Sequence, residues 1–363
     1  MVAVAGLPYP ITIAAGALDE LGDVVRRLTP DNRAVIFADA NVVEPYGRRA
    51  AKSLRRPKGA VMVIKVPAGE KTKTRETWAS LTDALLEQGF GRDTTIIAIG
   101  GGVVGDLVGF VAATYMRGVP VVQVPTTLLA MVDASVGGKT GVDTRAGKNL
   151  VGAFHQPVAV VIDPLVLQTL PVEHLRAGFA EIVKHGVIAD ADYFERANRF
   201  VDQWSPPLSG HQGLPELTAL IQRSVEIKAG IVTRDERELG LRKVLNFGHT
   251  IGHAIEAATH FQTLHGEAVA MGLVAEARMA ERLGLAAPGI AGSIERVCRK
   301  AGLPTALPRI PVDMLIGFTR TDKKARAGRV EYALPKRIGE MAGGDRGWTV
   351  AVDDAVVREA LTA

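Results

Sequence analysis

Three of the chain's eight histidines lie within seventeen residues, in the stretch that runs from His249 through His253 to His265. His249 and His253 are four residues apart and would share one face of a helix. Packing alone does not explain such a cluster, and histidine is a common metal ligand, so the stretch predicts a metal site. Spacing alone favours His249 and His253 as the ligand pair. The stretch is not the His-Glu-x-x-His motif of zinc proteases, because Thr250 stands where that motif needs its glutamate.

A carboxylate for this site is available in the segment Ala180-Glu181-Ile-Val-Lys184. Glu181 and Lys184 are three residues apart and share a helical face, which by itself indicates an ordinary surface ion pair. Beside a histidine cluster, however, Glu181 becomes the missing metal ligand and Lys184 a group that can bind substrate. Cys298 is the only cysteine, so we expect a metal held by histidine and carboxylate.

A glycine-rich turn, Gly100-Gly101-Gly102-Val103-Val-Gly105-Asp106, follows the apolar run Thr94–Ile99 and precedes small, apolar residues typical of a helix. It satisfies Gly-x-Gly-x-x-Gly, in which glycines let a pyrophosphate approach the amide groups of a helix N-terminus. Asp39 ends another predicted strand and can accept hydrogen bonds from a ribose, although it precedes the glycines. We therefore predict a dinucleotide site on a variant of the usual winding; the alternative is a tight strand–helix turn.

Several other polar groups follow predicted strands or glycines. The segment from Ser135 to Gly141 resembles a phosphate loop, but Asp133 occupies the first glycine position of the NTPase motif. Its Gly-Gly-Lys139-Thr turn can still hold an anion, and Lys148 with Asn149 could extend that site. Thr126 and Thr127 can cap the next helix or bind a nucleotide.

Two further segments carry charge. Arg242 precedes the histidine stretch and could clamp a substrate carboxylate in bidentate fashion. The loops Pro67–Lys73 and Asp322–Lys324 would be ordinary solvated loops if nothing else marked them.

These residues need elements that position them, and the chain changes character near Leu167. Residues 1–167 alternate β-branched runs with helical stretches, which predicts an α/β, Rossmann-like domain with a parallel sheet. Residues 168–363 predict a mainly α-helical domain, with amphipathic helices such as Pro215–Val232 and Glu267–Leu283. A short strand pair is expected at Arg329–Leu334 and Trp348–Val352. The predicted strands of the first domain are Arg33–Ala38, Val61–Val66, Thr94–Ile99, Val119–Val124 and Val158–Ile162.

Composition restricts the class of protein. The 363 residues are 47% hydrophobic, which is ample for buried cores, and no apolar run is long enough to span a membrane. With no signal-like N-terminus either, we expect a cytoplasmic protein. The net charge is only +4, basic residues are scattered, and aromatic residues make up 5% of the chain, so nucleic acid is not an expected partner.

Eight motifs occur together and in order between about residues 35 and 340, and together they resemble the 3-dehydroquinate synthase family. They are Gly-Gly-Gly-Val-Val-Gly-Asp106, Tyr-Met-Arg117-Gly, Pro-Thr-Thr127-Leu-Leu, Val-Gly-Gly-Lys139-Thr-Gly, Gly-Lys-Asn149, Ala-Glu181-Ile-Val-Lys, Leu-Asn246-Phe-Gly-His-Thr-Ile-Gly-His and Leu-His265-Gly-Glu-Ala-Val-Ala. One such motif would be weak, but eight in register are specific.

The resemblance implies an NAD- and divalent-metal-dependent lyase, with zinc or cobalt as the metal. It would convert 3-deoxy-D-arabino-heptulosonate 7-phosphate to 3-dehydroquinate and phosphate in the shikimate pathway. It also implies a Rossmann-like domain, a helical domain and a homodimer.

The resemblance further implies roles for individual residues. Glu181, His249 and His265 would be the metal ligands, so that His265 replaces His253 in the pair that spacing favours. His253 would then face the substrate phosphate or act in proton transfer. The residues implied in NAD binding are Asp39, Asn41, Glu70, Lys73, Gly101, Gly102, Val103, Gly105, Asp106, Thr126, Thr127, Leu129, Asp133, Lys139, Lys148, Thr169 and Leu170. Those implied in substrate binding and catalysis are Asp133, Lys139, Asn149, Lys184, Lys228, Arg242, Asn246, His253, Lys323 and, towards a partner subunit, Arg117; Lys324 and Lys336 are alternatives to Lys323.

Three competing functions are kept. A related cyclase acting on sedoheptulose 7-phosphate would share the fold and both cofactors, but it has no substrate carboxylate for Arg242 to bind. A metal-dependent polyol dehydrogenase would have no use for the phosphate-binding groups around Lys139 and Asn149. A nucleotide-binding regulator with a dead site is disfavoured, because the candidate ligands and lysines are all present.

Overall fold

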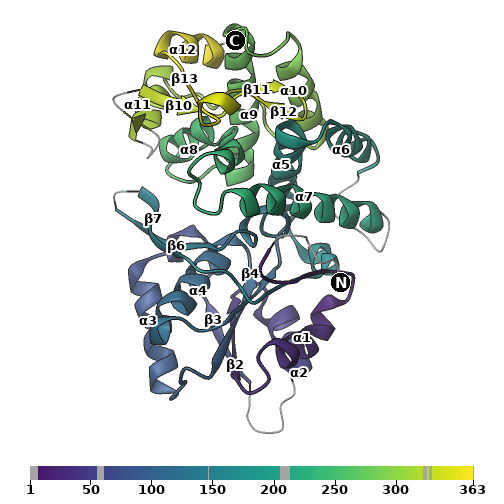
Figure 1. Cartoon of the computed structure of the whole chain (residues 1–363), viewed down its shortest axis with the longest axis vertical. Helices are drawn as coiled ribbons and strands as arrows, with labels where there is room; N and C mark the ends of the chain where they lie inside the picture. Colours follow the sequence, from purple (N-terminus) through teal and green to yellow (C-terminus); the bar gives the residue numbers. More distant parts are fainter. Residues whose placement is uncertain are drawn as a thin grey trace. The chain divides into compact units, whose positions relative to one another are not determined.

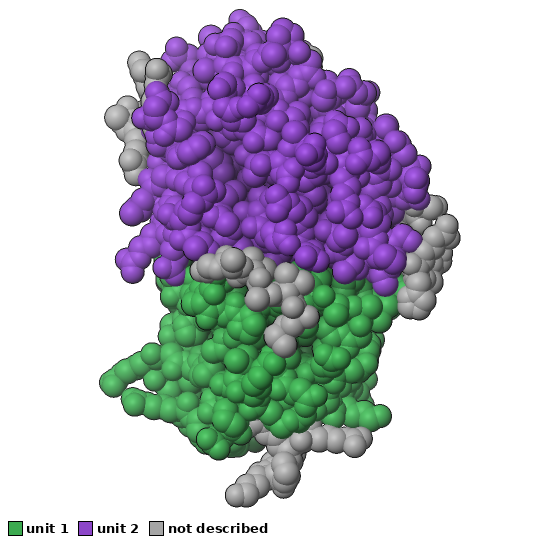
Figure 2. All heavy atoms as spheres, turned by 45° about the vertical axis from the view of Figure 1, so that its right-hand side comes forward, with its two compact units in different colours: residues 1–170 green, residues 171–363 purple. Residues whose placement is uncertain are grey.

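The computed structural model describes residues 7–54, 61–145, 147–204, 213–321, 325–326 and 329–362. The chain divides into two compact units, residues 1–170 and 171–363 (Figure 2). The division lies between Leu170 and Pro171, near the predicted position at Leu167. No helix in the described ranges is long and apolar enough to cross a membrane.

A six-stranded parallel sheet forms the centre of unit 1 (Figure 1). Its strand order is β1-β8-β5-β4-β2-β3, and all its pairings are parallel. The strands are β1 (Ile11–Ile13), β2 (Arg33–Asp39), β3 (Met62–Val66), β4 (Thr94–Gly100), β5 (Val121–Pro125) and β8 (Ala159–Ile162). The five predicted strands and the predicted fold class are confirmed, and β1 is an additional edge strand.

Helices cover both faces of this sheet, with α3 and α4 on one side and α1 and α2 on the other (Figure 1). Apolar side chains of β2 and β4, such as Phe37 and Ile96, pack with Leu85 of α3 and Leu107 of α4 in a buried core. The helices are α1 (Leu21–Leu28), α2 (Arg48–Ser53), α3 (Arg75–Glu87) and α4 (Gly102–Thr114). Single turns are η1 (Ala17–Glu20), η2 (Val43–Gly47), η3 (Glu70–Thr72), η4 (Tyr115–Arg117), η5 (Ala130–Ala134) and η6 (Pro164–Thr169).

The strand order contains a switch point. From β2 the chain passes to β3 on one side, and then to β4, β5 and β8 in succession on the other. Ligands of open parallel sheets bind outside the carboxyl ends of strands at such a point. The carboxyl ends of β2 and β4 carry Asp39 and the glycine-rich turn, so the topology places both candidates at the expected edge.

A two-stranded antiparallel hairpin, which was not predicted, is formed by β6 (Lys139–Thr144) and β7 (Gly147–Phe154). It contains the segment that resembled a phosphate loop and lies against α4, where a Cβ on Gly109 would meet Thr140 at 2.6 Å. Lys139 is therefore the first residue of a strand.

Unit 2 is mainly helical, as predicted. Predicted helices at Pro215–Val232 and Glu267–Leu283 correspond to α7 and α9, and the predicted strand pair corresponds to β10 and β13, which pair antiparallel through Glu331 and Ala351. The helices are α5 (Val172–Ala189), α6 (Ala191–Gln203), α7 (Leu214–Arg234), α8 (His249–Ala258), α9 (His265–Arg282), α10 (Ile290–Lys300), α11 (Val312–Thr321) and α12 (Asp354–Thr362). Short elements are η7 (Leu241–Asn246), η8 (Gly344–Arg346), β9 (Ala325–Arg326), β10 (Arg329–Tyr332), β11 (Pro335–Arg337), β12 (Glu340–Met341) and β13 (Val350–Ala351).

Candidate active site

Three helices of unit 2 bring Glu181, His249 and His265 together. Glu181 of α5 is fully buried, and its Oε1 atom lies 3.6 Å from Nε2 of His249 and 3.6 Å from Nε2 of His265. One ligand atom from each residue lies within 4.8 Å of the other two. Two imidazoles and one carboxylate are the protein ligands of many catalytic metal sites that keep a position open for substrate.

The other ring nitrogens of both histidines face acceptors. Nδ1 of His249 lies 3.1 Å from the carbonyl oxygen of Phe247, and Nδ1 of His265 lies 3.2 Å from Oε2 of Glu256. A ring nitrogen that faces an acceptor carries the proton, which leaves the Nε2 lone pairs directed at the Glu181 side. This arrangement is the usual outer shell of metal-binding histidines, so the three residues fit a divalent transition metal.

His253 lies beside this cluster, with its ring centre 5.6 Å from that of His249 and 6.1 Å from that of His265. In the described part of the chain, no group of potential ligands contains both His249 and His253. A second group does combine His253 with Glu256 and His265, but there Glu256 already faces Nδ1 of His265. The geometry thus favours Glu181, His249 and His265 over the pair expected from spacing.

Charges around the cluster shift the two histidines in opposite directions. Burial, reinforced by the positive charge of Lys184, lowers the pKa of His249 well below 6.5. Burial would also lower the pKa of His265, but the negative charge of Glu256 and hydrogen bonds to Glu181 and Glu256 outweigh it and raise this pKa to about 10. Without a metal, a proton therefore occupies His265 at neutral pH.

Glycines allow the ligand-bearing helices to approach closely. A Cβ on Gly266, next to His265, would lie 1.9 Å from the carbonyl oxygen of Ala177, one turn before Glu181 on α5. A Cβ on Gly272 of α9 would lie 2.0 Å from the carbonyl oxygen of Gly248, directly before His249. Side chains at Gly266 and Gly272 would push these helices apart, so the glycines fix the spacing of the ligands.

A buried carboxylate adds to this contact. Glu276, one turn after Gly272 on α9, accepts hydrogen bonds from the amide nitrogen of Gly248 at 2.6 Å and from that of Ile251 at 3.1 Å. It therefore caps the N-terminus of α8 from the neighbouring helix.

Basic groups lie on the same helices and on the turn before α8. Lys184 forms an ion pair with Glu181, and because both are buried the pair belongs to the interior and not to the surface. Lys228 on α7 and Arg242 on η7 are also buried. The carboxylate of Asp235 accepts hydrogen bonds from the amide nitrogens of Leu239, Gly240 and Arg242, and so shapes the turn that carries Arg242.

The guanidinium of Arg242 donates to the carbonyl oxygen of Glu236, and Nδ2 of Asn246 donates to Glu238 at 2.5 Å. Lys336 pairs with Glu340 at 2.7 Å. Lys323 and Lys324 fall outside the described residues.

At the sheet edge of unit 1, predicted nucleotide groups follow three adjacent strands. Ala38 pairs with Ile99 and Gly100 pairs with Pro125, so Asp39, the glycine turn and Thr126 stand side by side. Gly102 begins α4, so its N-terminal amide groups are available at this edge as the motif requires. Thr127 caps the following turn, because its Oγ1 accepts from the amide nitrogen of Ala130 at 3.2 Å.

The glycines of this turn are also needed for packing. A Cβ on Gly101 would lie 3.1 Å from Thr127, one on Gly102 would lie 3.3 Å from Ala134, and one on Gly105 would lie 3.0 Å from Gln123. The two explanations weighed for the motif, a tight strand–helix turn and a nucleotide site, are therefore compatible.

The loop after β3 reaches α4 and the hairpin. Lys73 is buried, and its Nζ lies 2.6 Å from Oδ2 of Asp106 and 2.5 Å from Oδ1 of Asn149. Lys148 pairs with Glu70 at 3.1 Å. The negative charges of Asp106 and Glu70 overcome the effect of burial and raise the pKa of Lys73. Five residues predicted from separate motifs thus form one polar network.

The remaining predicted residues of unit 1 are distributed around these groups. Asn41 donates its amide hydrogen to Asp39 at 2.8 Å, and Oγ1 of Thr169 lies 2.7 Å from the hydroxyl of Tyr46. Arg117 is exposed on η4 in a left-handed conformation with φ of 68°. Val103 lies on α4, Leu129 precedes η5, Asp133 lies on η5, Lys139 begins β6 and Leu170 ends the unit.

Sequence reasoning did not identify four carboxylates that hold predicted residues in place. They are Asp143, Asp235, Glu256 and Glu276. Glu256 was within the histidine stretch, three residues after His253, which could have marked it as a partner for a metal-binding histidine. The other three had no local signal, because their hydrogen bonds depend on the turn or helix that folds against them.

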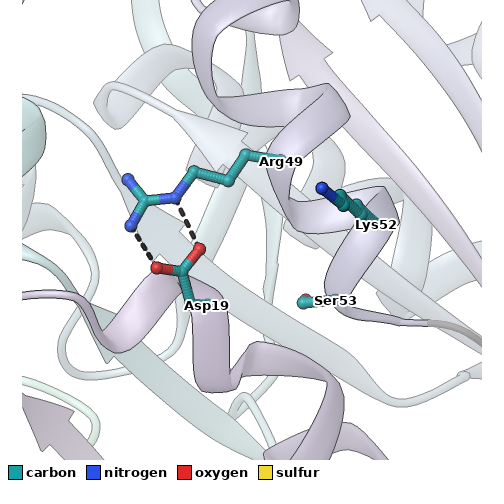
Figure 3. Close-up of a pocket in the computed structure, with 4 residues that line it drawn as sticks. All are labelled: Asp19, Arg49, Lys52 and Ser53. Atoms are coloured by element: carbon teal, nitrogen blue, oxygen red, sulfur yellow. Dashed lines mark hydrogen bonds and ion pairs between the residues drawn. The ribbon is translucent and has the colours of Figure 1, made fainter.

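A separate hollow of about 540 Å³ in unit 1 is lined by Asp19, Arg49, Lys52 and Ser53 (Figure 3). Arg49 and Asp19 face each other across it and form two hydrogen bonds, at 2.6 and 2.5 Å. None of the predicted site residues lines this hollow.

The fold and the Glu-His-His cluster place the chain in the sugar phosphate cyclase superfamily. A solved 2-deoxy-scyllo-inosose synthase, complexed with carbaglucose-6-phosphate, NAD⁺ and Co²⁺, has a TM-score of 0.84 at 24% identity and covers 99% of this chain and 98% of its own. The 2-epi-5-epi-valiolone synthase from Streptomyces hygroscopicus subsp. jinggangensis 5008, with NAD⁺ and Zn²⁺ bound, has a TM-score of 0.83 at 30% identity and covers 100% and 98%.

Within that superfamily, the chain belongs to the 3-dehydroquinate synthase family. The model for the 3-dehydroquinate synthase N-terminal region matches residues 63–177, and the model for the C-terminal region matches residues 178–325. A 3-dehydroquinate synthase of Symbiobacterium thermophilum is 47% identical over 92% of this chain and 92% of its own length. The expectation drawn from the eight motifs is confirmed.

Proposed function

We propose that this protein is a 3-dehydroquinate synthase that uses NAD and a divalent metal, zinc or cobalt. The reaction is the conversion of 3-deoxy-D-arabino-heptulosonate 7-phosphate to 3-dehydroquinate and phosphate. The observation that carries the proposal is the Glu181, His249 and His265 cluster in a chain 47% identical to a named synthase. Residues 1–167 would bind NAD and residues 168–363 the metal.

When bound, NAD would supply reversible hydride transfer, and the metal would supply a Lewis acid for the oxygens of the reacting carbon atoms. Glu181, His249 and His265 would hold the metal through Oε1 and the two Nε2 atoms. Asp39 would accept hydrogen bonds from a ribose of NAD, and the amide groups from Gly101 to Gly105 would face its pyrophosphate. The donor set of the cluster and the sheet topology support these assignments.

Removal of phosphate requires groups that hold an anion more than a strong base. Lys139, Asn149, Asn246 and His253 would hold the phosphate, and Arg242 the carboxylate of the substrate. Lys184 and Lys228 would bind substrate oxygens as cations, and Asp133 would orient substrate and cofactor. Arg117, exposed on η4, would reach the phosphate site of a second subunit in a homodimer. We place the enzyme in the cytoplasm.

Two other functions are possible for this fold. A sedoheptulose 7-phosphate cyclase is favoured by the likeness to the valiolone synthase, which is 30% identical, but less so than the synthase at 47%. A polyol dehydrogenase of the wider fold would leave the anion-binding lysines without a role.

Phosphate release from 3-deoxy-D-arabino-heptulosonate 7-phosphate, in the presence of NAD and zinc or cobalt, tests the proposal. Mass analysis should find 3-dehydroquinate without net NADH, and a chelator should abolish its formation. Sedoheptulose 7-phosphate is the control substrate. Turnover of that sugar alone would reassign the protein to the other cyclases, and net NADH would reassign it to the dehydrogenases.

A further inference from the structure

The hairpin of unit 1 contains an irregularity at Lys148 and Asn149. Val142 pairs with Val151 and Thr144 pairs with Gly147, so a single residue on β6, Asp143, faces three on β7, Lys148, Asn149 and Leu150. Such a bulge redirects side chains, and bulges are frequent next to active sites. Asn149 is exposed in this bulge and adopts a left-handed conformation with φ of 54°.

Three contacts between Asp143, Asn149 and Lys73 close a ring around the bulge. Oδ1 of Asp143 accepts from the amide nitrogen of Asn149 at 2.9 Å. The amide nitrogen of Asp143 donates to the carbonyl oxygen of Lys73 at 2.7 Å. Nζ of Lys73 then donates to Oδ1 of Asn149 at 2.5 Å. The conformation of Asn149, which is uncommon for a residue with a side chain, is thus fixed at its backbone and at its amide oxygen.

The ring also determines which end of the Asn149 amide faces outward. An ammonium group only donates hydrogen bonds, so it must face the oxygen of the amide and not its nitrogen. Lys73 is held in place by the charge of Asp106, and only 4% of its side chain is exposed. The Nδ2 group of Asn149 therefore points away from Lys73 as a donor, which suits an anionic oxygen.

We propose that Asp143 is a positioning residue for substrate binding, which holds Asn149 in the bulge so that its Nδ2 group donates to the phosphate of the substrate. The identity of the phosphate compound rests on the proposed function, whereas the orientation of the amide does not. Asp143 itself would not touch the substrate, and its effect passes through the backbone of Asn149.

The experiment compares Asp143→Ala and Asp143→Asn in the full chain loaded with NAD and zinc. Inorganic phosphate is the first probe, titrated by calorimetry, and the heptulosonate phosphate is the second. Asp143→Ala should raise the Kd of phosphate and the KM of the substrate about tenfold, with kcat changed less than threefold. Asp143→Asn keeps an acceptor oxygen for the Asn149 amide and should restore both constants to within about threefold of the native values.

Thr144→Val is the matched control, because Oγ1 of Thr144 donates to the carbonyl oxygen of Gly147 in the same hairpin without contacting Asn149. It should leave phosphate affinity unchanged. Equal losses in Thr144→Val and Asp143→Ala would overturn the proposal, since the hairpin as a whole would then be responsible. Unchanged phosphate affinity in Asp143→Ala would also overturn it, as would an Asp143→Asn variant that binds as weakly as Asp143→Ala.

A second variant tests the amide orientation if Asp143→Ala does not fold. Asn149→Asp keeps an oxygen for Lys73 but replaces the outward donor with a negatively charged acceptor, so phosphate affinity should fall at least tenfold. Native affinity in this variant would contradict the orientation. Because these titrations use inorganic phosphate, they test the proposal even if the native chain fails to form 3-dehydroquinate, a result that would overturn only the proposed function.

Discussion

The two units place their functional groups by different physical means. In unit 1, Asp39, the glycine turn and Thr126 stand side by side because each follows a strand of one parallel sheet, and strand order alone decides their proximity. In unit 2, Glu181, His249 and His265 come from three helices, and their proximity depends on how closely those helices pack. A sheet edge therefore presents a site that tolerates small shifts, whereas the helical cluster depends on individual contacts.

The largest expected difference between the units comes from the metal ligands. His265→Ala should lose the metal and lower kcat by roughly a thousandfold, because a Lewis acid contributes several kcal/mol and each 1.36 kcal/mol is about tenfold in rate. NAD affinity, a property we assign to unit 1, should remain. Metal content by elemental analysis and NAD binding by calorimetry check both halves.

His253→Ala is the matched variant, since its ring lies 5.6 Å from that of His249 without being among the proposed ligands. It should keep the metal and lose rate. If His253→Ala were metal-free while His265→Ala still held metal, the ligand assignment would be wrong.

The pH dependence of metal affinity should separate the units next. A metal needs the neutral form of His265, whose pKa in the metal-free protein is about 10. Below that value a proton competes with the metal, so affinity should rise about tenfold per pH unit, or roughly a hundredfold from pH 6.5 to 8.5. Competition against a chelator of known pH dependence measures it.

Glu256→Gln is the control for this slope. Without the negative charge of Glu256 the pKa of His265 should fall towards or below neutrality, so the slope should flatten above pH 7. A steep slope that persists in Glu256→Gln would show that another group competes with the metal. NAD affinity should not follow this profile in either protein.

The same contrast explains what the sequence could predict. Five strands of unit 1 were recognisable because each is a buried apolar run, and their order at one edge followed from parallel winding. The hairpin was missed because glycines and the bulge at Lys148 and Asn149 interrupt the alternation by which strands are recognised. The three residues of β1 are too few to show a pattern.

In unit 2 the helices were predicted, but the ligand set was not derivable from spacing. His249 and His253 share a helix, whereas His265 reaches the site only because Gly266 lets α9 approach Ala177. Family resemblance supplied the choice that local periodicity could not. The hydrogen bonds of Glu276 and Asp143 are long-range or depend on a turn, so neither residue had a recognisable motif.

A smaller effect is expected at the sheet edge. Asp39→Ala should weaken NAD binding about tenfold, because it removes a charged hydrogen-bond acceptor worth roughly 1.5–3 kcal/mol, and metal content should not change. Asp23→Ala, which removes an exposed carboxylate of α1 in the same unit, is the control. Loss of metal in Asp39→Ala, or native NAD affinity, would contradict the division of roles between the units.

The smallest expected effect tests whether helix packing controls the metal cluster. Two carboxylates of α9 cap neighbouring helices in the same way: Glu276 accepts from Gly248 and Ile251 of α8, and Glu281 accepts from Gly289 and Ala291 of α10. Only α8 carries a proposed ligand. Glu276→Gln places a donor against one of the two amide groups and should lower metal affinity about threefold to tenfold, the loss of roughly one hydrogen bond.

Glu281→Gln weakens the corresponding cap of α10 and should leave metal affinity within about twofold, since hydrogen bonds elsewhere on α9 do not reach the cluster. Metal titrations and thermal unfolding on both variants separate the two effects. Equal losses of metal affinity would mean that the overall stability of unit 2 controls the site. Native affinity in Glu276→Gln would mean that the glycine contacts at Gly266 and Gly272 hold the ligands in register without help from the cap.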